Sequence, residues 1–140
     1  MGTRSLTIVK EEGHDLCVMY RQYGGYLSKH GRDLAEFLKD GVVVNGISMA
    51  ETRKIFNGLG CLSASLFAHF KEDVGNVYLY PVGSRDCGEE YIYTIWTTDK
   101  GEIKLNVHDV YENKSIFDGT PNDFILKQLS NKIEREEVNV

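Results

Sequence analysis

A cluster of tyrosines, arginines and glycines has the residue types that would bind a phosphorylated ligand with a flat ring. The segment 20–26 reads YRQYGGY and a histidine follows at position 30. Tyrosine rings stack on bases, guanidinium groups bind phosphate through paired hydrogen bonds, and glycine lets backbone N–H groups approach an anion. The candidate ligand-binding residues in this cluster are Tyr20, Arg21, Gln22, Tyr23, Gly25, Tyr26 and His30. The alternative is a strand that packs its rings on the core and then turns.

Three residues outside this segment complete the candidate site. Arg4 lies near the start, Arg85 lies in a second segment of tyrosine, glycine and arginine at 78–91, and Asn57 precedes two glycines at the start of a predicted helix. We expect Arg4, Arg21 and Arg85 to neutralise a pyrophosphate, while Gln22 or Asn57 contacts ribose or base edges. The alternatives are a surface ion pair for Arg85 and a simple helix cap at the glycines.

Catalytic signatures are missing from the sequence, apart from one short pattern. The chain has no Walker A motif, no G-x-G-x-x-G, no H-E-x-x-H and no G-x-S-x-G. Glu102 and Lys104 on a predicted strand, with Asp86 or Asp99 upstream, match the D…E-x-K pattern of metal-dependent nucleases. A solvated strand face gives the same alternation. We therefore predict no enzyme, no cofactor and no metal site, with the nuclease as the less favoured alternative.

The elements that must position these residues follow from hydrophobic periodicity. Alternating residues predict an N-terminal hairpin and a later β-meander, and 3.6-residue spacing predicts the helices. The expected strands cover residues 5–10, 16–23, 76–80, 90–97 and 102–109, and the expected helices cover 34–41, 59–71 and 121–133. Short turns between successive strands favour antiparallel pairing. We predict an α+β fold in which about three helices pack on one antiparallel sheet.

Length and charge limit the classes of partner. The 140 residues, with 41% apolar and 26% charged side chains, fit one domain over residues 1–140. A formal net charge of −5 is the wrong sign for a protein that binds DNA, RNA or an anionic membrane surface. No apolar run approaches the roughly 18 residues of a membrane span. Three cysteines without a C-x-x-C indicate a reducing cytoplasm.

Several of these segments also resemble a family of small proteins encoded in bacteriophages and prophages. The likeness runs from residue 1 to about residue 95 and is carried by MGTRSLT at 1–7, YRQ at 20–22, GY at 25–26, HG at 30–31, LAEFL at 34–38, NGLGCL at 57–62 and GEEYIY at 88–93. The resemblance implies a phage origin and the host bacterial cytoplasm. Small phage proteins of this size include the anti-Thoeris and anti-CBASS sponges, which withhold nucleotide second messengers from bacterial immunity. The resemblance thus implies a sponge, with a cyclic ADP-ribose isomer preferred over a cyclic dinucleotide.

Two further expectations concern protein partners. The same tyrosine- and arginine-rich surface is typical of a protein–protein hot spot, so the alternative function is an interaction module that inhibits a host defence protein. Neither face of the predicted strand 90–97 is clearly polar. We therefore expect a homo-oligomer whose ligand site lies at a subunit boundary near Tyr26 and Arg85. Alternatively, the last helix covers that face and the chain is a monomer.

Overall fold

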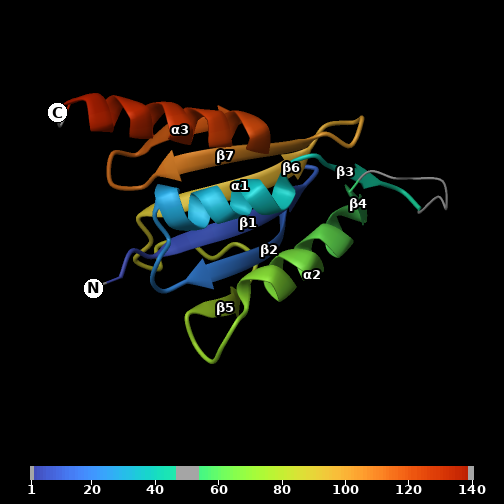
Figure 1. The fold of residues 1–140 in the computed structure, drawn as a ribbon. Coiled ribbons are helices and arrows are strands. Elements are labelled where there is room, and N and C mark those ends of the chain that lie inside the picture. Colours follow the sequence, from blue (N-terminus) through green and yellow to red (C-terminus); the bar gives the residue numbers. More distant parts are fainter. Residues whose placement is uncertain (1, 47–53, 139–140) are drawn as a thin grey trace.

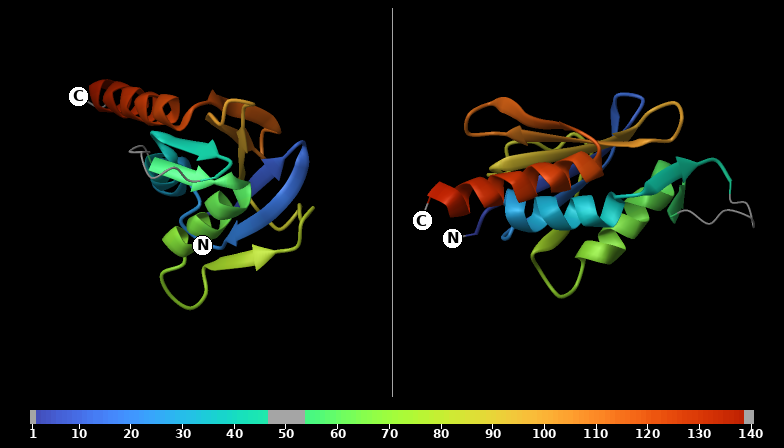
Figure 2. Two further views of the ribbon diagram at one scale, coloured as in Figure 1. Left: turned by 90° about the vertical axis from the view of Figure 1, so that its right-hand side faces the viewer. Right: turned by 45° about the horizontal axis from the view of Figure 1, so that its top comes forward.

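The computed structural model describes residues 2–46 and 54–138, with side chains as far as residue 130. Its centre is a six-stranded sheet in the order β5-β2-β1-β6-β7-β8, with the helices over one face (Figure 1; Figure 2). The strands are β1 (Ser5–Glu11), β2 (His14–Arg21), β3 (Gly41–Val44), β4 (Lys54–Asn57), β5 (Val77–Tyr80), β6 (Tyr91–Thr97), β7 (Ile103–Asp109) and β8 (Lys114–Gly119). The helices are η1 (Leu27–Gly31), a single π turn, and α1 (Arg32–Leu38), α2 (Gly58–Phe70) and α3 (Pro121–Val138).

The predicted α+β class is confirmed, and the sheet is mixed rather than purely antiparallel. β1 and β2 form the expected hairpin, in which Glu12 and Gly13 both take positive φ, as a tight hairpin turn requires. β6 and β7 pair in an antiparallel way as expected for the meander, and β8, which was not predicted, extends it. β5 was expected in the same meander, but it pairs with β2 instead. β1 and β6 pair in parallel, because the chain leaves the edge strand β5 and crosses under β2 and β1 before it enters β6.

The main core lies between the sheet and the helices. Alternate strand residues point to this face, including Val9, Met19, Tyr93, Ile95 and Leu105. The helices contribute Leu34 and Leu38 from α1, Leu62, Leu66 and Phe70 from α2, and Phe124 from α3. Apolar side chains of the strands and of the helices therefore pack in one layer. This layer holds the ends of β1 and β2 in place relative to η1.

The opposite face of β1 and β2 is covered by residues 81–90 rather than by a helix. Leu6, Ile8 and Val18 are buried there, and Cys87 of this crossing segment packs against them. The terminal helix does not cover this face, because Phe124 of α3 belongs to the core on the helix side. The expectation of an oligomer was argued from strand 90–97, and residues 81–90 cover the part of this face over β1 and β2. The oligomeric state itself stays a prediction.

The short strands β3 and β4 form a separate parallel ribbon that contacts the β6–β7 turn. The backbone N–H of Val43 donates to the carbonyl of Gly101 at 2.9 Å, and α2 begins directly after β4. Across residues 2–46 and 54–138, no helix has the length and apolar character needed to span a bilayer.

Candidate functional site

The ten predicted site residues do not form one pocket. Arg21, Gln22, Tyr23, Gly25, Tyr26 and His30 lie at or just beyond the end of β2, whereas Arg4, Tyr20 and Arg85 lie on the opposite face and Asn57 lies at the junction of β4 and α2. The cause is the alternation of a strand. Tyr20 and Arg21 are neighbours in β2, so their side chains point to opposite faces of the sheet. Within one chain the predicted residues therefore lie in three separate places, and the expected site at a subunit boundary stays a prediction.

Tyr20 is a core residue. Its ring is buried and stacks on the ring of Tyr80 with 4.7 Å between centroids and 8° between planes. Tyr78 contacts it in a tilted arrangement from the same strand. A ligand base could not stack on Tyr20 without displacing Tyr80, so the packing alternative is correct for this residue.

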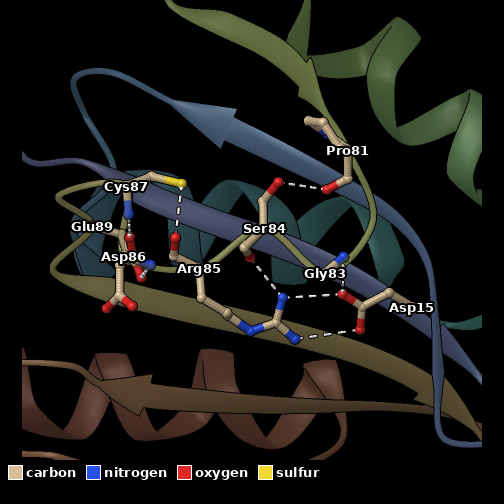
Figure 3. Close-up of polar contacts among 8 residues, drawn as sticks. All are labelled: Asp15, Pro81, Gly83, Ser84, Arg85, Asp86, Cys87 and Glu89. Atoms are coloured by element: carbon tan, nitrogen blue, oxygen red, sulfur yellow. Dashed lines mark hydrogen bonds and ion pairs between the residues drawn. The ribbon is translucent and has the colours of Figure 1, made fainter.

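Arg85 is held by a carboxylate from another element. Its Nη1 lies 3.0 Å from Asp15 Oδ2 and its Nη2 lies 3.3 Å from Asp15 Oδ1, while the N–H of Gly83 donates to the same carboxylate at 3.0 Å (Figure 3). The hydrogen bond from Arg85 lowers the pKa of Asp15 below its ordinary value. The charge of Arg85 is thus already paired, with Asp15 rather than with a neighbouring acidic residue.

Arg4 and Glu89 help to hold the same crossing segment. A Cβ built on Gly88 would lie 2.6 Å from Arg4 Nη1, so the Arg4 guanidinium packs directly against this glycine. The Glu89 carboxylate accepts the N–H groups of Asp86 at 3.2 Å and Cys87 at 2.6 Å (Figure 3). These contacts order residues 81–90 over the sheet, and they give Arg4 a structural setting away from Arg21.

Asn57 lies next to the start of α2, which borders a different hollow. Asn57 Oδ1 accepts the N–H of Gly46 at 2.8 Å, so this side chain ties β3 to β4. Nearby, an open groove of about 950 Å³ runs between the hairpin tips and the start of α2. Its charged lining residues are Lys10, Glu11, Glu12, Asp99 and Lys100. Because acidic residues outnumber basic ones, this groove does not favour an anion.

Arg21 and His30 form a polar pair inside the helix-side core. Arg21 is only 9% exposed, and its Nη1 donates to His30 Nδ1 at 3.0 Å while its Nε donates to the carbonyl of Tyr23 at 2.9 Å. Since Nδ1 accepts, the proton of the neutral ring is on Nε2, which donates to Thr7 Oγ1 at 2.7 Å. Burial and the charge of Arg21 lower the pKa of His30 to about 3, so the ring is neutral at pH 7.

Among the described residues, the charge of Arg21 has no partner of opposite sign at contact distance. Within the part of the chain that the structure describes, no carboxylate forms an ion pair with it; Asp33 and Glu72 act on it only from farther away. Burial lowers the pKa of Arg21, but a guanidinium stays protonated in proteins. Taking a charge out of water without a counter-ion costs on the order of several kcal/mol.

The π turn η1 determines which side chains surround Arg21. The N–H of Gly31 reaches back to the carbonyl of Tyr26 at 3.4 Å, and the wider turn places His30 inside. The aliphatic part of the Lys29 side chain instead lies against Gly24, beside Arg21. Gly31 must be glycine because a Cβ there would lie 2.8 Å from the ring of Phe124. Such π turns are common at functional sites.

Some of the other predicted site residues beyond the end of β2 are exposed to solvent, and one is buried and needed for packing. Tyr23 and Tyr26 are 52% and 43% exposed, and Gln22 is exposed as well. Gly25 instead packs against Ser5, where a Cβ would be 2.7 Å from the serine side chain, and its carbonyl accepts the hydroxyl of Tyr93 at 2.8 Å. Gly25 is thus needed for packing, while both tyrosines are available to a ligand.

Comparison with known proteins adds no family to this geometry. No family model, curated protein or solved structure matches the chain. The resemblance to phage proteins therefore stays a prediction.

The nuclease pattern is not assembled as a metal site. Lys104 Nζ forms an ion pair with Glu102 Oε1 at 3.2 Å, while Asp99 lies in the β6–β7 turn and Asp86 lies in the crossing segment. Among the residues that the structure describes, no three His, Cys, Asp or Glu side chains gather around one point. The arrangement gives the nuclease alternative no support.

Sequence reasoning missed Thr7 and Lys29 as neighbours of the Arg21 and His30 pair. Thr7 carried a usable signal, because with Ser5 it places hydroxyls on the inward face of an otherwise apolar strand. No feature of the sequence indicated Lys29, because only the π turn brings its side chain beside Arg21.

Proposed function

We propose that this protein is a phage-encoded, non-enzymatic binding protein that sequesters a nucleotide second messenger in the host bacterial cytoplasm. The ligand lies at the end of β2, beside Arg21, Tyr23 and Tyr26. The observation that carries the proposal is the charge of Arg21, which forms no ion pair with any described residue, is 9% exposed and has exposed tyrosine rings in the adjoining loop. A phosphate supplies the missing counter-charge, and a base stacks on a tyrosine ring.

The arrangement favours a cyclic ADP-ribose isomer over a cyclic dinucleotide. A pyrophosphate carries its two charges side by side, which suits one compact cationic cluster. A cyclic dinucleotide carries two phosphodiesters on opposite sides of a ring, which would need two clusters. Arg85 does not supply the second cluster, because it is paired with Asp15 on the other face.

The deciding experiment is capture and release. The protein is incubated with a panel of cyclic nucleotides, freed of unbound ligand, denatured by heat, and the released compound is identified by chromatography and mass. We expect an intact cyclic ADP-ribose isomer from the wild type and much less from Arg21→Gln. A linearised or hydrolysed product would show an enzyme, and no capture of any nucleotide would refute the proposal.

A second candidate function rests on a different surface. The edge strand β5 and the residues after it expose apolar side chains, with Leu79 70% exposed and Val82 also exposed. Lys71 Nζ donates to the carbonyls of Gly75 and Val77, which blunts this edge against strand addition. A host protein would therefore dock on the side chains. Under this alternative, Leu79→Glu abolishes inhibition of host defence while nucleotide capture is unchanged; under the sponge proposal it leaves inhibition intact.

A further inference from the structure

A small apolar pocket lies between α3, β8 and η1. Lys127 and Gln128 follow Phe124 by three and four residues, so the three side chains share one face of α3. This face closes a pocket of about 150 Å³ whose walls are mainly aliphatic and aromatic. Its lining residues are Leu27, Ile116, Phe117, Phe124, Lys127 and Gln128. Apolar cavities of roughly this size bind a benzene ring. The pocket therefore suits one six-membered apolar ring.

The aromatic floor of the pocket is held by two contacts. Phe124 is 2% exposed, and its ring meets the ring of Phe117 edge to face, with 5.1 Å between centroids and 85° between planes. The same Phe124 ring lies against the backbone of Gly31, where an added Cβ would be 2.8 Å from it. The floor therefore does not have to be ordered when a ligand binds, which avoids one cost of binding.

Lys127 places a positive charge at the rim of the pocket. Its side chain is exposed, its Nζ donates to the carbonyl of Ile116 at 2.9 Å, and the same nitrogen lies 5.8 Å from the centroid of the Phe117 ring. An ammonium group has three N–H donors, so two remain beyond the one used by Ile116. No carboxylate among the described residues pairs with Lys127. A ligand in the pocket can therefore accept a hydrogen bond from an ammonium that is already anchored.

These properties favour an apolar ring that carries one negative charge. The side chains of the four apolar lining residues offer no hydrogen-bond partner, so the ring nitrogens of a base would lose their bonds to water without replacement. A phenyl ring has no such groups, and it gains from contact with Phe117 and Phe124. A single ammonium balances a single charge, and its hydrogen bond to a carboxylate is strengthened by both charges.

We infer that this pocket binds a small aromatic monocarboxylate, with its ring between Leu27, Phe117 and Phe124 and its carboxylate on Lys127. The site does not depend on the proposed function, because Arg21, Tyr23 and Tyr26 do not line the pocket. A nucleotide and an aromatic acid would bind at separate places, so each ligand can be tested without the other.

The test compares three probes: phenylacetate, its neutral analogue phenylacetamide, and acetate, which lacks the ring. Binding is followed by the unfolding temperature and by the chemical shifts of the Leu27 and Ile116 methyl groups in NMR spectra of the full chain. We expect phenylacetate to raise the unfolding temperature and to shift both methyl signals, because a ligand that binds only the folded state stabilises it. Phenylacetamide should bind about threefold to tenfold more weakly, and acetate should have no effect at the same concentration.

Two variants with matched controls test the ring and the charge separately. Leu27→Phe should abolish binding by filling the pocket, whereas Leu126→Phe makes the same change at a 65% exposed residue of α3 outside the lining and should bind like the wild type. Lys127→Met keeps the aliphatic stem and should reduce the affinity for phenylacetate to that for phenylacetamide. Lys114→Met removes the same charge from an exposed ion pair on β8 and should leave both affinities unchanged.

The inference is overturned if phenylacetate shifts neither methyl signal, or if acetate raises the unfolding temperature as much as phenylacetate does. Equal affinity of the wild type for phenylacetate and phenylacetamide would show a pocket for an uncharged ring, such as a phenylalanine side chain of a partner, and would also overturn it. If Leu27→Phe fails to fold, the comparison of Lys127→Met with Lys114→Met decides. Equal affinity for phenylacetate in these two variants would refute the site, because position 127 would then have no special role.

Discussion

Arg21 Nη1 lies 3.0 Å from His30 Nδ1, so a permanent cation donates a hydrogen bond to a buried histidine that must stay neutral. Protonated His30 would lose this bond and place a second positive charge beside the guanidinium. His30 is fully buried, so we expect it to position Arg21 rather than to contact a ligand, although the sequence predicted it as a ligand-binding residue.

The hydrogen bond between His30 and Arg21 makes the free energy of unfolding depend on pH over a defined range. The folded pKa of about 3 lies below the ordinary value of 6.5, so the unfolded chain binds more protons between these values. Stability is then full above about pH 6.5 and falls as the pH drops toward 3, by at most about 1.4 kcal/mol per pH unit from this group. Urea unfolding at several pH values checks this. We expect a shallower pH dependence in His30→Gln, and an identical slope in both proteins would contradict the assignment.

Removing each of two hydroxyls on β1 should change the free energy of unfolding in opposite directions. Ser5 Oγ is buried without a hydrogen-bond partner, whereas Thr7 Oγ1 accepts from His30. We expect Ser5→Ala to be neutral or to stabilise by up to about 1 kcal/mol, and Thr7→Val to destabilise by about 1–3 kcal/mol because it leaves His30 Nε2 unpaired. Both variants keep the strand and its face, so each controls for the other in chemical unfolding. A destabilised Ser5→Ala would mean that its hydroxyl has a partner.

Arg85 should matter little for ligand capture. Its ion pair with Asp15 joins the crossing segment to β2, and Arg85 is a third exposed, so Arg85→Gln should cost no more than about 1 kcal/mol of stability. The pKa of Asp15 is lowered, so its contribution is present above its ordinary pKa of 3.8 and is lost as the pH falls below it. In Arg85→Gln, acid unfolding should begin at higher pH while nucleotide capture is unchanged. Loss of capture would return Arg85 to the site.

Local patterns predicted the elements of this fold but not all of their pairing. Alternation over 5–10 and 90–97, and the Thr120-Pro121 start of the last helix, were sufficient for those elements. β8 was missed because KSIFDG mixes charges and glycine with few apolar residues. The parallel pairing of β1 with β6 depends on a crossing segment of irregular structure, and no local periodicity encodes which strand such a segment reaches.

The candidate site was only partly predictable, for the same reason. Its centre at Arg21, Tyr23 and Tyr26 was recognised from residue type. The separation of Tyr20 from Arg21 was also available, since strand alternation requires it. The position of Lys29 beside Arg21 depends on the π turn, and a turn that differs from an α-helical one by a single residue leaves no signal in hydrophobic spacing.

The last prediction concerns oligomeric state. Tight capture needs most of a ligand's surface enclosed, yet the rings of Tyr23 and Tyr26 are about half exposed beside Arg21 in the single chain. We therefore expect at least a dimer in which a second copy covers these rings, and light scattering should give a mass of twice 15.9 kDa or more when ligand is bound. Tyr26→Ser should shift the mass toward the monomer and weaken capture, whereas Leu79→Ser on the β5 edge should leave both unchanged. Dissociation by Leu79→Ser would place the interface at β5 instead. A ligand-bound mass near 16 kDa at micromolar concentration would refute the shared site, and the pocket would then lie within one chain.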